Sequence, residues 1–274
     1  MRRARTERPE NFEVDLSHPL MRGAVLLGLG QAHHSIRYRD ESAKGNHGTL
    51  TGYTGAGNTP ADRWGRALGR AVLEFNGSSD DVPLDSSLFN CPSFTAAAWV
   101  RFDAVNKYHY VWARDDDGTS RYFVLGCDTG ARPYAVVWNA SNSLAEMRPS
   151  VTVTAKSWYH LALTYIPGSQ KVYLNGRVID TATLAGDAKS SGTTPTHLGK
   201  QAGSAWLAGA VGDAVFWSRA LSPAEIMQLA DPSNVMLSGA IREPRPRRNF
   251  IGQVAAKPWL YAHRRSSRVI GVGI

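Results

Sequence analysis

WYHLALTYIPGSQKVYLNGRVID, residues 158–180, is the stretch that decides the fold. Its first nine residues carry largely apolar side chains at both alternating sets of positions, which predicts a strand covered on both faces. Pro167-Gly168-Ser169 is a turn, because proline fixes φ and glycine accepts positive φ. Asn175-Gly176 predicts a hairpin, because a type I′ turn needs positive φ at both central residues. The stretch is therefore a β-meander of three strands.

Similar β-patterned runs lie on both sides of the meander. The clearest is FTAAAWVRF, residues 94–102, which alternates two sets of side chains as a core strand does. Many short runs at near-regular spacing predict an all-β fold, a two-sheet antiparallel β-sandwich. The other predicted strands are 23–29, 47–50, 71–75, 108–113, 121–127, 134–139 and 206–217.

One short helix is predicted near the C-terminal end of the sandwich. Ser222-Pro223-Ala224-Glu225 forms a capping box, in which serine caps the helix and glutamate reaches back. Leu221 and Ile226 stand at the hydrophobic-staple positions. Asp231-Pro232 ends the helix after about two turns.

The chain of 274 residues divides into three predicted parts: an extended N-terminal arm (1–22), the sandwich (23–232) and a basic Pro- and Arg-rich C-terminal tail (233–274). The net charge of +8 is uneven, since residues 239–274 hold eight basic side chains and one acid, and the first ten residues four arginines and two glutamates. The remaining body is close to neutral. The high isoelectric point therefore belongs to the two arms, which favours an anionic partner.

The C-terminal tail has two interpretations. Aromatic residues interleaved with arginine suit stacking on nucleic acid. Alternatively, the tail anchors the protein to an acidic protein surface, and residues 269–274 add a strand to a neighbour's sheet. The apolar residues favour docking on protein over nucleic acid. The predicted anchoring residues are Arg242, Arg245, Arg247, Arg248, Trp259, Tyr261, Arg264, Arg265 and Arg268.

No export signal is recognised in the sequence, because the charged first eight residues are not followed by a sufficiently long apolar run. Residues 23–30 are too few to span a bilayer. We therefore expect synthesis in the cytoplasm and no membrane span. Cys91 and Cys127 fit neither a metal-binding spacing nor a disulfide framework, and are predicted to be half-buried free thiols.

Motifs of known catalytic sites are missing from the sequence: it has no nucleophile elbow, phosphate-binding glycine loop or His-Glu-x-x-His. Glu13 and Asp15 come nearest to the paired carboxylates of a retaining glycosidase, but they lie in the arm. His33 and His34 are adjacent, so their side chains diverge in an extended segment. The acidic run 115–117 lacks the alternate spacing of an EF-hand. We predict that the protein is not an enzyme.

Four stretches together resemble the laminin-G-like, concanavalin A-like jelly-roll family over residues 20–232. They are DESAKGNHGTLTG (40–52), LEFNGSSDDVPL with FTAAAWVRF (73–102), the meander, and LAGAVGDAVFWSRALSPAEI (207–226). Family members mostly bind glycans or proteins, and a few cleave glycans, so the fold alone does not decide the function. The resemblance implies a structural Ca²⁺ ion with Asp40, Asp80 and Asp213 as ligands. For Asp213 the alternative is a buried strand aspartate satisfied by backbone donors.

Glycan binding needs exposed aromatic side chains beside polar groups. The sequence places several such residues on or near strands that would line one face of the sandwich. The alternative is that most of them are core residues, since aromatic side chains dominate sandwich cores. The candidate glycan-binding residues are Tyr108, Tyr110, Trp112, Trp138 and Asn139.

The end of the chain, a short helix followed by Asp-Pro and an Arg/Pro-rich tail, also resembles jelly-roll proteins of tailed bacteriophages. The leading hypothesis is a non-enzymatic virion structural protein, either a capsid decoration protein or a surface fibre protein. Its arms would fasten it to the capsid shell or to sister copies in a homo-oligomer. Its sandwich would bind a host-surface glycan. The alternatives are a free carbohydrate-binding module or lectin, and a glycan-cleaving enzyme.

Overall fold

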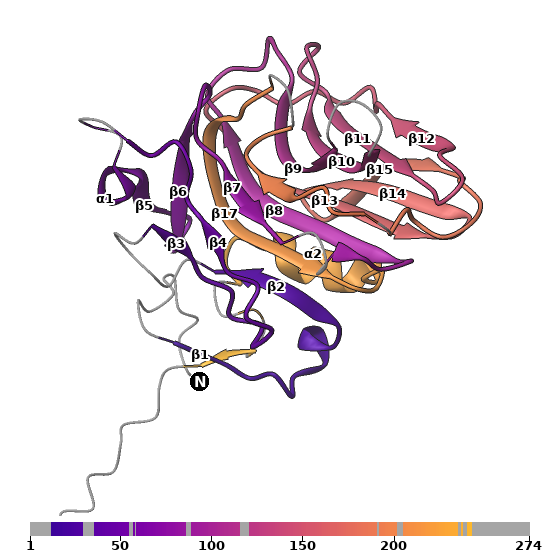
Figure 1. Ribbon diagram of the computed structural model, residues 1–274, viewed down its shortest axis with the longest axis horizontal. Helices are drawn as coiled ribbons and strands as arrows, with labels where there is room; N and C mark the ends of the chain where they lie inside the picture. The colour runs from indigo at the N-terminus through magenta and orange to yellow at the C-terminus, as the bar shows by residue number, and fades with distance from the viewer. Residues whose placement is uncertain are drawn as a thin grey trace, which may run out of the picture. The chain divides into compact units, whose positions relative to one another are not determined.

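Two antiparallel sheets face each other in the computed structural model, with a shared hydrophobic core between them (Figure 1). The predicted all-β sandwich is confirmed. No helix in the part of the chain that the structure describes is long and apolar enough to cross a membrane. The structure describes residues 12–29, 36–54, 57, 59–85, 89–115, 121–190, 192–201, 205–234, 237 and 240–242.

The larger sheet has eight strands, and the predicted meander supplies three of them. Its order is β15 (Arg177–Ala182), β14 (Ser169–Leu174), β13 (Trp158–Ile166), β8 (Phe94–Phe102), β17 (Ala208–Trp217), β6 (Arg70–Asn76) and β5 (Trp64–Ala67), with β2 (Ala24–Gly28) paired to β17. Long strands lie at its centre, where both faces are covered, and the shorter β5 and β15 form its edges.

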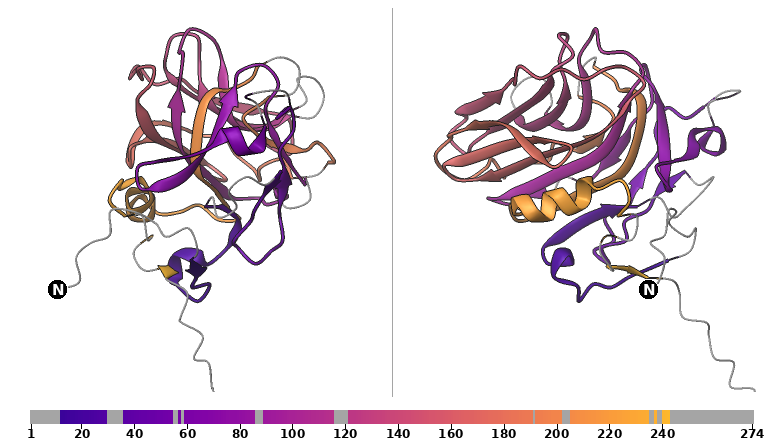
Figure 2. Two further views of the ribbon diagram at one scale, coloured as in Figure 1. Left: turned by 90° about the vertical axis from the view of Figure 1, so that its left-hand side faces the viewer. Right: turned by 180° about the vertical axis from the view of Figure 1, so that it is seen from behind.

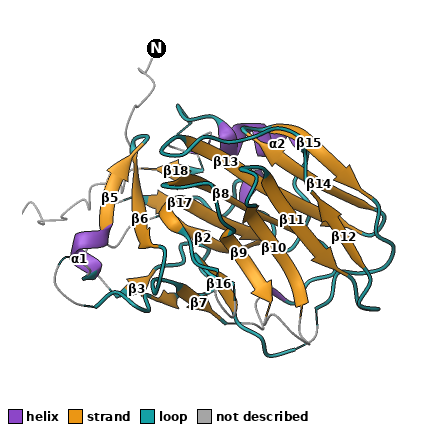
Figure 3. Cartoon of the chain, turned by 90° about the horizontal axis from the view of Figure 1, so that it is seen from above, coloured by secondary structure: helices purple, strands orange, loops and turns teal. Residues whose placement is uncertain are grey.

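The smaller sheet has six strands, of which β9 to β12 lie side by side in Figure 3. Its order is β12 (Leu144–Met147), β11 (Pro133–Trp138), β10 (Arg121–Cys127), β9 (His109–Asp115), β16 (Thr196–Leu198) and β7 (Val82–Leu84). Two small ladders complete the described strands: β1 (Glu13–Val14) with β18 (Ile241–Arg242), and β3 (Arg37–Tyr38) with β4 (Gly48–Thr49).

Alternation along β8 shows how the strand sequences produce the sandwich. Phe94, Val100 and Phe102 point into the core between the sheets, whereas Ala97 points to the opposite side and joins a second apolar cluster. Both faces of the strand are therefore buried, as predicted for the centre of the larger sheet. Cys91 and Cys127 are free thiols, but both are fully buried and not half-buried. Burial raises the pKa of each thiol to about 12.

Both predicted turns of the meander are present. Gly168 has φ of +81° between β13 and β14. Asn175 and Gly176 have φ of +50° and +81° between β14 and β15, as the predicted hairpin requires. The second turn also needs glycine for space, because a Cβ on Gly176 would lie 3.1 Å from the Met227 Cα.

Helix α2 (Pro223–Ala230) covers the outer face of the larger sheet (Figure 2). The predicted capping box is confirmed: the backbone N–H of Ser222 donates to Glu225 Oε2 at 2.8 Å, and the Ser222 hydroxyl accepts from the Glu225 N–H. Hydrogen bonds from Arg219 and Ser222 lower the pKa of Glu225 to about 2. Two further helical turns, η1 (Pro19–Met21) and α1 (Pro60–Arg63), were not predicted.

The N-terminal segment from residue 12 to 22 packs on the sandwich and is not the extended arm that the sequence predicted. Phe12, Leu20 and Met21 are buried in the same apolar cluster as α2. The pairing of β1 with β18 adds backbone hydrogen bonds, so residues 241 and 242 of the predicted tail also lie against this segment. The physical reason is the apolar content of residues 12–21, which is stabilised by burial.

A buried polar cluster lies between the larger sheet and α2. Arg70 is fully buried, and its Nε lies 2.9 Å from Asp213 Oδ2. The guanidinium group also lies 5.2 Å from the centre of the Trp99 ring. Asp213 has φ of +45° at an irregularity in β17, a conformation that aspartate tolerates better than most residues. Asp213 is thus a buried strand aspartate, as in the alternative interpretation, and an arginine is among its partners.

His160 lies beside this cluster and makes the fold acid-sensitive. Burial, with a contribution from Arg70, lowers the pKa of His160 from 6.5 to about 3. Below pH 6.5 the unfolded chain takes up a proton that the folded chain excludes. The contribution of His160 to the free energy of unfolding should therefore fall by about 1.4 kcal/mol per pH unit between pH 6.5 and about 3. Urea denaturation measured from pH 7 to pH 4 checks this slope.

His160→Gln should make the pH dependence less steep, because glutamine does not titrate. The contribution of His109, whose pKa burial lowers to about 4, remains. His18→Gln is the matched control, since His18 lies outside the buried polar cluster. An equally steep profile in His160→Gln would show that another group causes the acid sensitivity.

Candidate functional site

A third apolar cluster lies on the outer face of the smaller sheet, apart from the inter-sheet core. It contains tyrosines and one tryptophan from β9, from the residue before β9 and from β11, with valines from β10 and β11 between them. We call this surface the aromatic face and define it by Tyr108, Tyr110, Ala113, Val124, Tyr134, Val136 and Trp138.

Gly126 lies at the centre of this arrangement. It pairs with Tyr110 on one neighbouring strand and with Tyr134 on the other. Because glycine has no side chain, the two tyrosine rings approach above it, with centroids 6.3 Å apart. A Cβ at Gly126 would lie 1.9 Å from the His109 carbonyl oxygen, so the position requires glycine. Tyr108 stacks on Tyr110 at 6.0 Å with an interplanar angle of 3°.

Tyr108 and Tyr134 supply the accessible aromatic surface of this face. Both are half-buried, whereas Tyr110 and Trp138 are only 7% exposed and lie at its base. The Tyr134 ring meets the Tyr108 ring edge-on at 5.5 Å. Burial raises the pKa of Tyr134 to about 12, so its hydroxyl is neutral at physiological pH and can both donate and accept hydrogen bonds.

Three of the five predicted glycan-binding residues, Tyr108, Tyr110 and Trp138, meet on the aromatic face. Trp112 does not: it is fully buried in the inter-sheet core, where its Nε1 donates to the Ala97 carbonyl at 3.1 Å. The cause is a register shift between β9 and β10, which places Val111 as an extra residue. Tyr110 and Trp112, two positions apart, therefore point to opposite faces.

Asn139, the fifth predicted residue, organises the turn after β11. It is 7% exposed, and its Nδ2 donates to the Ala185 carbonyl at 2.8 Å. Its Oδ1 accepts hydrogen bonds from the backbone N–H groups of Ser141 and Ser143. All of these bonds hold loops beside the sheet in place.

Tyr134 and the basic residues around the aromatic face were missed at the sequence level. The Arg148 guanidinium lies 4.7 Å from the Tyr134 ring centre, and that of Arg121 lies 5.8 Å from the Trp138 ring centre. The alternation of Tyr134, Val136 and Trp138 along β11 was the signal that could have identified Tyr134. The arginines carried no such signal, because they lie on other strands or beyond strand ends.

The three aspartates predicted to bind Ca²⁺ do not form one site. Asp40 accepts from the backbone N–H groups of Leu27, Ser42 and Asn46 and from the Ser42 hydroxyl, so its oxygens organise the 40–46 loop. Asp80 accepts from the Asn76 N–H, and Asp213 faces a guanidinium group. Within the described residues no three His, Cys, Asp or Glu side chains are grouped to hold a metal ion. These residues do not fit a shared calcium ion.

The predicted anchoring residues lie almost entirely outside the described residues. Of Arg242 only the backbone is described, in β18. The predicted anchoring residues that lie outside the described residues are Arg245, Arg247, Arg248, Trp259, Tyr261, Arg264, Arg265 and Arg268.

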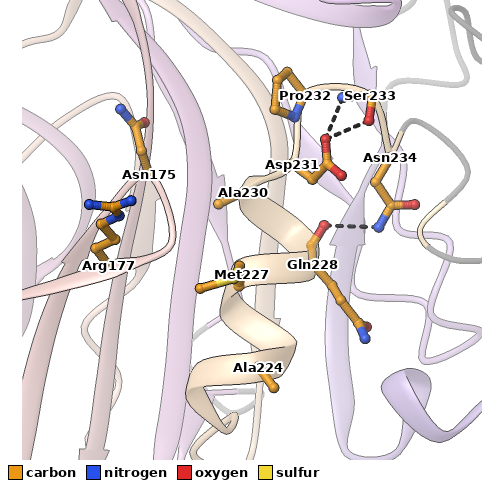
Figure 4. Close-up of a pocket in the computed structure, with 10 residues that line it drawn as sticks. All are labelled: Asn175, Arg177, Ala224, Met227, Gln228, Ala230, Asp231, Pro232, Ser233 and Asn234. Carbon is orange, nitrogen blue, oxygen red and sulfur yellow. Dashed lines mark hydrogen bonds between the residues drawn. The ribbon is translucent and has the colours of Figure 1, made fainter.

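An open groove of about 740 Å³ lies beside α2, next to the turn between β14 and β15 (Figure 4). Its polar side chains include Asp231, which accepts from the Ser233 N–H at 2.8 Å, and Asn234, which donates to the Gln228 carbonyl at 2.9 Å. These bonds stabilise the end of the helix and do not converge on the groove. The groove therefore has less of the character of a binding site than the aromatic face.

The fold and the aromatic face together define a lectin-like β-sandwich. The family model described as the concanavalin A-like lectin/glucanases superfamily, of the Laminin_G_3 type, matches residues 76–227. The chain belongs to this superfamily. No curated protein sequence matches the chain.

Solved structures with similar folds come from binding domains and from enzymes. The binding domain of Paraclostridial Mosquitocidal Protein 1 has a TM-score of 0.57 at 14% identity, covering 77% of this chain and 52% of its own. Domain 4 of AbnA, an arabinanase from Geobacillus stearothermophilus solved with arabinotriose, has a TM-score of 0.58 at 19% identity, and the match covers 76% of this chain and 100% of that domain. Trypanosoma rangeli sialidase has a TM-score of 0.57 at 17% identity, and the match covers 79% of this chain and 33% of the sialidase chain. The chain spans about half the length of the first of these structures, and at such identities the likeness shows the fold.

Proposed function

We propose that the protein is a non-catalytic lectin and that its aromatic face binds a glycan. The observation that carries this proposal is the pair of half-buried rings, Tyr108 and Tyr134, set beside arginine side chains and apart from the core. Aromatic rings offer flat apolar surface to sugar rings, and neighbouring polar groups orient their hydroxyls. The arabinotriose in the AbnA domain 4 structure is consistent with a sugar-binding role for this fold.

The carboxylates beside the aromatic face are unsuited to glycoside cleavage. A glycosidase needs one carboxyl group with a raised pKa to protonate the leaving group. Although burial alone would raise the pKa of Asp128, its hydrogen bonds to Arg132 and Gly130 hold that pKa below its ordinary value. Glu146 is bound by the Arg148 guanidinium. Both acids are therefore held by arginine side chains, which favours binding without catalysis.

Tyr134→Ala should weaken glycan binding about tenfold or more, because one of the two accessible rings of the aromatic face is removed. Glycan-array screening followed by titration calorimetry measures the change. Tyr159→Ala is the matched control, since Tyr159 is a half-buried tyrosine of the larger sheet and should leave the affinity unchanged. Equal affinity in all three proteins would exclude the aromatic face as the binding site.

We also propose that the tail fastens the protein to a virion, as a capsid decoration or fibre protein. The support is the charge distribution, in which the basic excess lies in the arms while the body is close to neutral. Deleting residues 245–274 should abolish co-sedimentation with phage particles while leaving β18 and the thermal midpoint unchanged. Particle association that survives the deletion would contradict the anchoring role. Nucleic-acid binding lost on deletion would instead favour the other interpretation of the tail.

A further inference from the structure

Two carboxylates beside the aromatic face, Asp115 and Asp128, are buried beneath the arginines that contact them. The side chains of Arg121, Arg132 and Arg148 are 40%, 38% and 35% exposed. Their partners Asp115 and Asp128 are 2% and 0% exposed. In each of these pairs the arginine is exposed to solvent and the aspartate is buried. The surface beside the aromatic rings is therefore more basic than the numbers of arginines and aspartates suggest. Among the carboxylates in these ion pairs, Glu146 is the exposed one, and it is held by Arg148.

The positive groups stand at both ends of the aromatic face. Arg148 lies over Tyr134 and Tyr108 at one end, and Arg121 lies over Trp138 at the other. Arg121 and Gly126, which lies between the tyrosines, are five residues apart on β10, or about 16 Å along the strand. On a neighbouring loop, the Lys200 ammonium group lies 4.3 Å from the centre of the Trp206 ring.

Arg148 keeps hydrogen-bonding capacity for a ligand. Both oxygens of Asp128 already accept hydrogen bonds, from the Gly130 N–H and from the backbone and side chain of Arg132. Arg148 Nη1 is 3.6 Å from Asp128 Oδ2, which is an ion-pair distance too long for a hydrogen bond. A guanidinium group has five N–H donors in a planar fork, and Arg148 already makes side-chain hydrogen bonds with Glu146, Tyr108 and Tyr134. Donors therefore remain with which Arg148 can bind a carboxylate or sulfate.

We infer that the ligand is an acidic glycan, whose sugar rings lie on Tyr108 and Tyr134 and whose anionic groups pair with Arg148 at one end of the aromatic face and Arg121 at the other. This inference rests on the proposed function of that face. Charge-assisted hydrogen bonds from arginine are stronger than neutral ones and select for carboxylate or sulfate. A neutral glycan offers these arginines no anionic group.

The experiment compares matched acidic and neutral glycans on the full chain. The probes are oligogalacturonate and its methyl ester, dextran sulfate and dextran, and carboxymethyl cellulose and hydroxyethyl cellulose. We expect at least one acidic member to bind about tenfold more tightly than its neutral counterpart, with a preference that shrinks as salt is added. Arg148→Gln and Arg121→Gln should each reduce that preference about threefold, because the two arginines share it.

Arg177→Gln is the control variant, because Arg177 is an exposed arginine on the hairpin beside α2, away from the aromatic face. The basic tail is present in every variant, so its binding to polyanions forms a constant background. One outcome would overturn the inference and leave the proposed function standing. In that outcome, neutral glycans bind as tightly as acidic ones, and the binding is lost in Tyr134→Ala. The inference would also fail if Arg177→Gln lowered the acidic preference as much as the Arg148 and Arg121 variants. No Tyr134-dependent binding to any probe would overturn both.

Discussion

Replacing Asp213 with asparagine is expected to lower the free energy of unfolding by about 3 kcal/mol. The reason is that Arg70 is fully buried, with its Nε 2.9 Å from the Asp213 carboxylate. Without that negative charge, the buried guanidinium group loses the carboxylate that lies at ion-pair distance. Asparagine tolerates the φ of +45° as aspartate does, so the backbone contribution is held constant. Urea denaturation at pH 7 measures the loss.

The double variant Arg70→Met with Asp213→Asn should recover a large part of this stability, because neither charge then remains buried. Asp103→Asn is the matched control. Asp103 pairs with Arg101, but its side chain is 44% exposed, so loss of this ion pair should lower the free energy of unfolding by less than about 1 kcal/mol. If Asp213→Asn were as stable as the unmodified protein, the Arg70–Asp213 pair could not be a major support of this region.

Trp112→Ala is expected to cost about 3–5 kcal/mol, the second large effect. Trp112 is fully buried and packs near the Phe89 and Phe216 rings, with centroids 6.2 Å and 6.1 Å away. Truncation leaves a cavity and removes the donor to the Ala97 carbonyl. Thermal and urea unfolding measure the loss.

Trp112→Phe keeps most of the volume and should remain folded, with a smaller loss of stability. Its glycan affinity should equal that of the unmodified protein, because Trp112 points away from the aromatic face. Tyr134→Ala should behave in the opposite way, with affinity lost and stability kept. If Trp112→Phe folded normally but no longer bound glycan, Trp112 would have to be part of the binding site, contrary to this prediction.

Local sequence signals predicted the central strands and the helix well. The strands at 94–102, 121–127 and 158–166 have the predicted bounds, because each combines β-branched or aromatic side chains with clear turn residues at its ends. The capping box before α2 likewise depends on residues within one turn of each other. Such features are local, so the sequence contains the interactions that form them.

Short strands were missed for the opposite reason. β7, β12 and β16 have only three or four residues, too few to show a period, and their strand conformation depends on hydrogen bonds to neighbouring strands. The burial of Phe12 was likewise not apparent, since the cluster that covers it is formed by residues far along the chain.

By itself, the sequence determined the sandwich, the β-meander at 158–180 and the capped helix, because period, turn chemistry and capping act between neighbouring residues. Only the tertiary structure decided which face each aromatic residue joins. One extra residue at Val111 separates Tyr110 from Trp112, and a distant arginine, Arg70, gives Asp213 a charged partner. These outcomes depend on register and on contacts between remote segments, which a one-dimensional pattern does not encode.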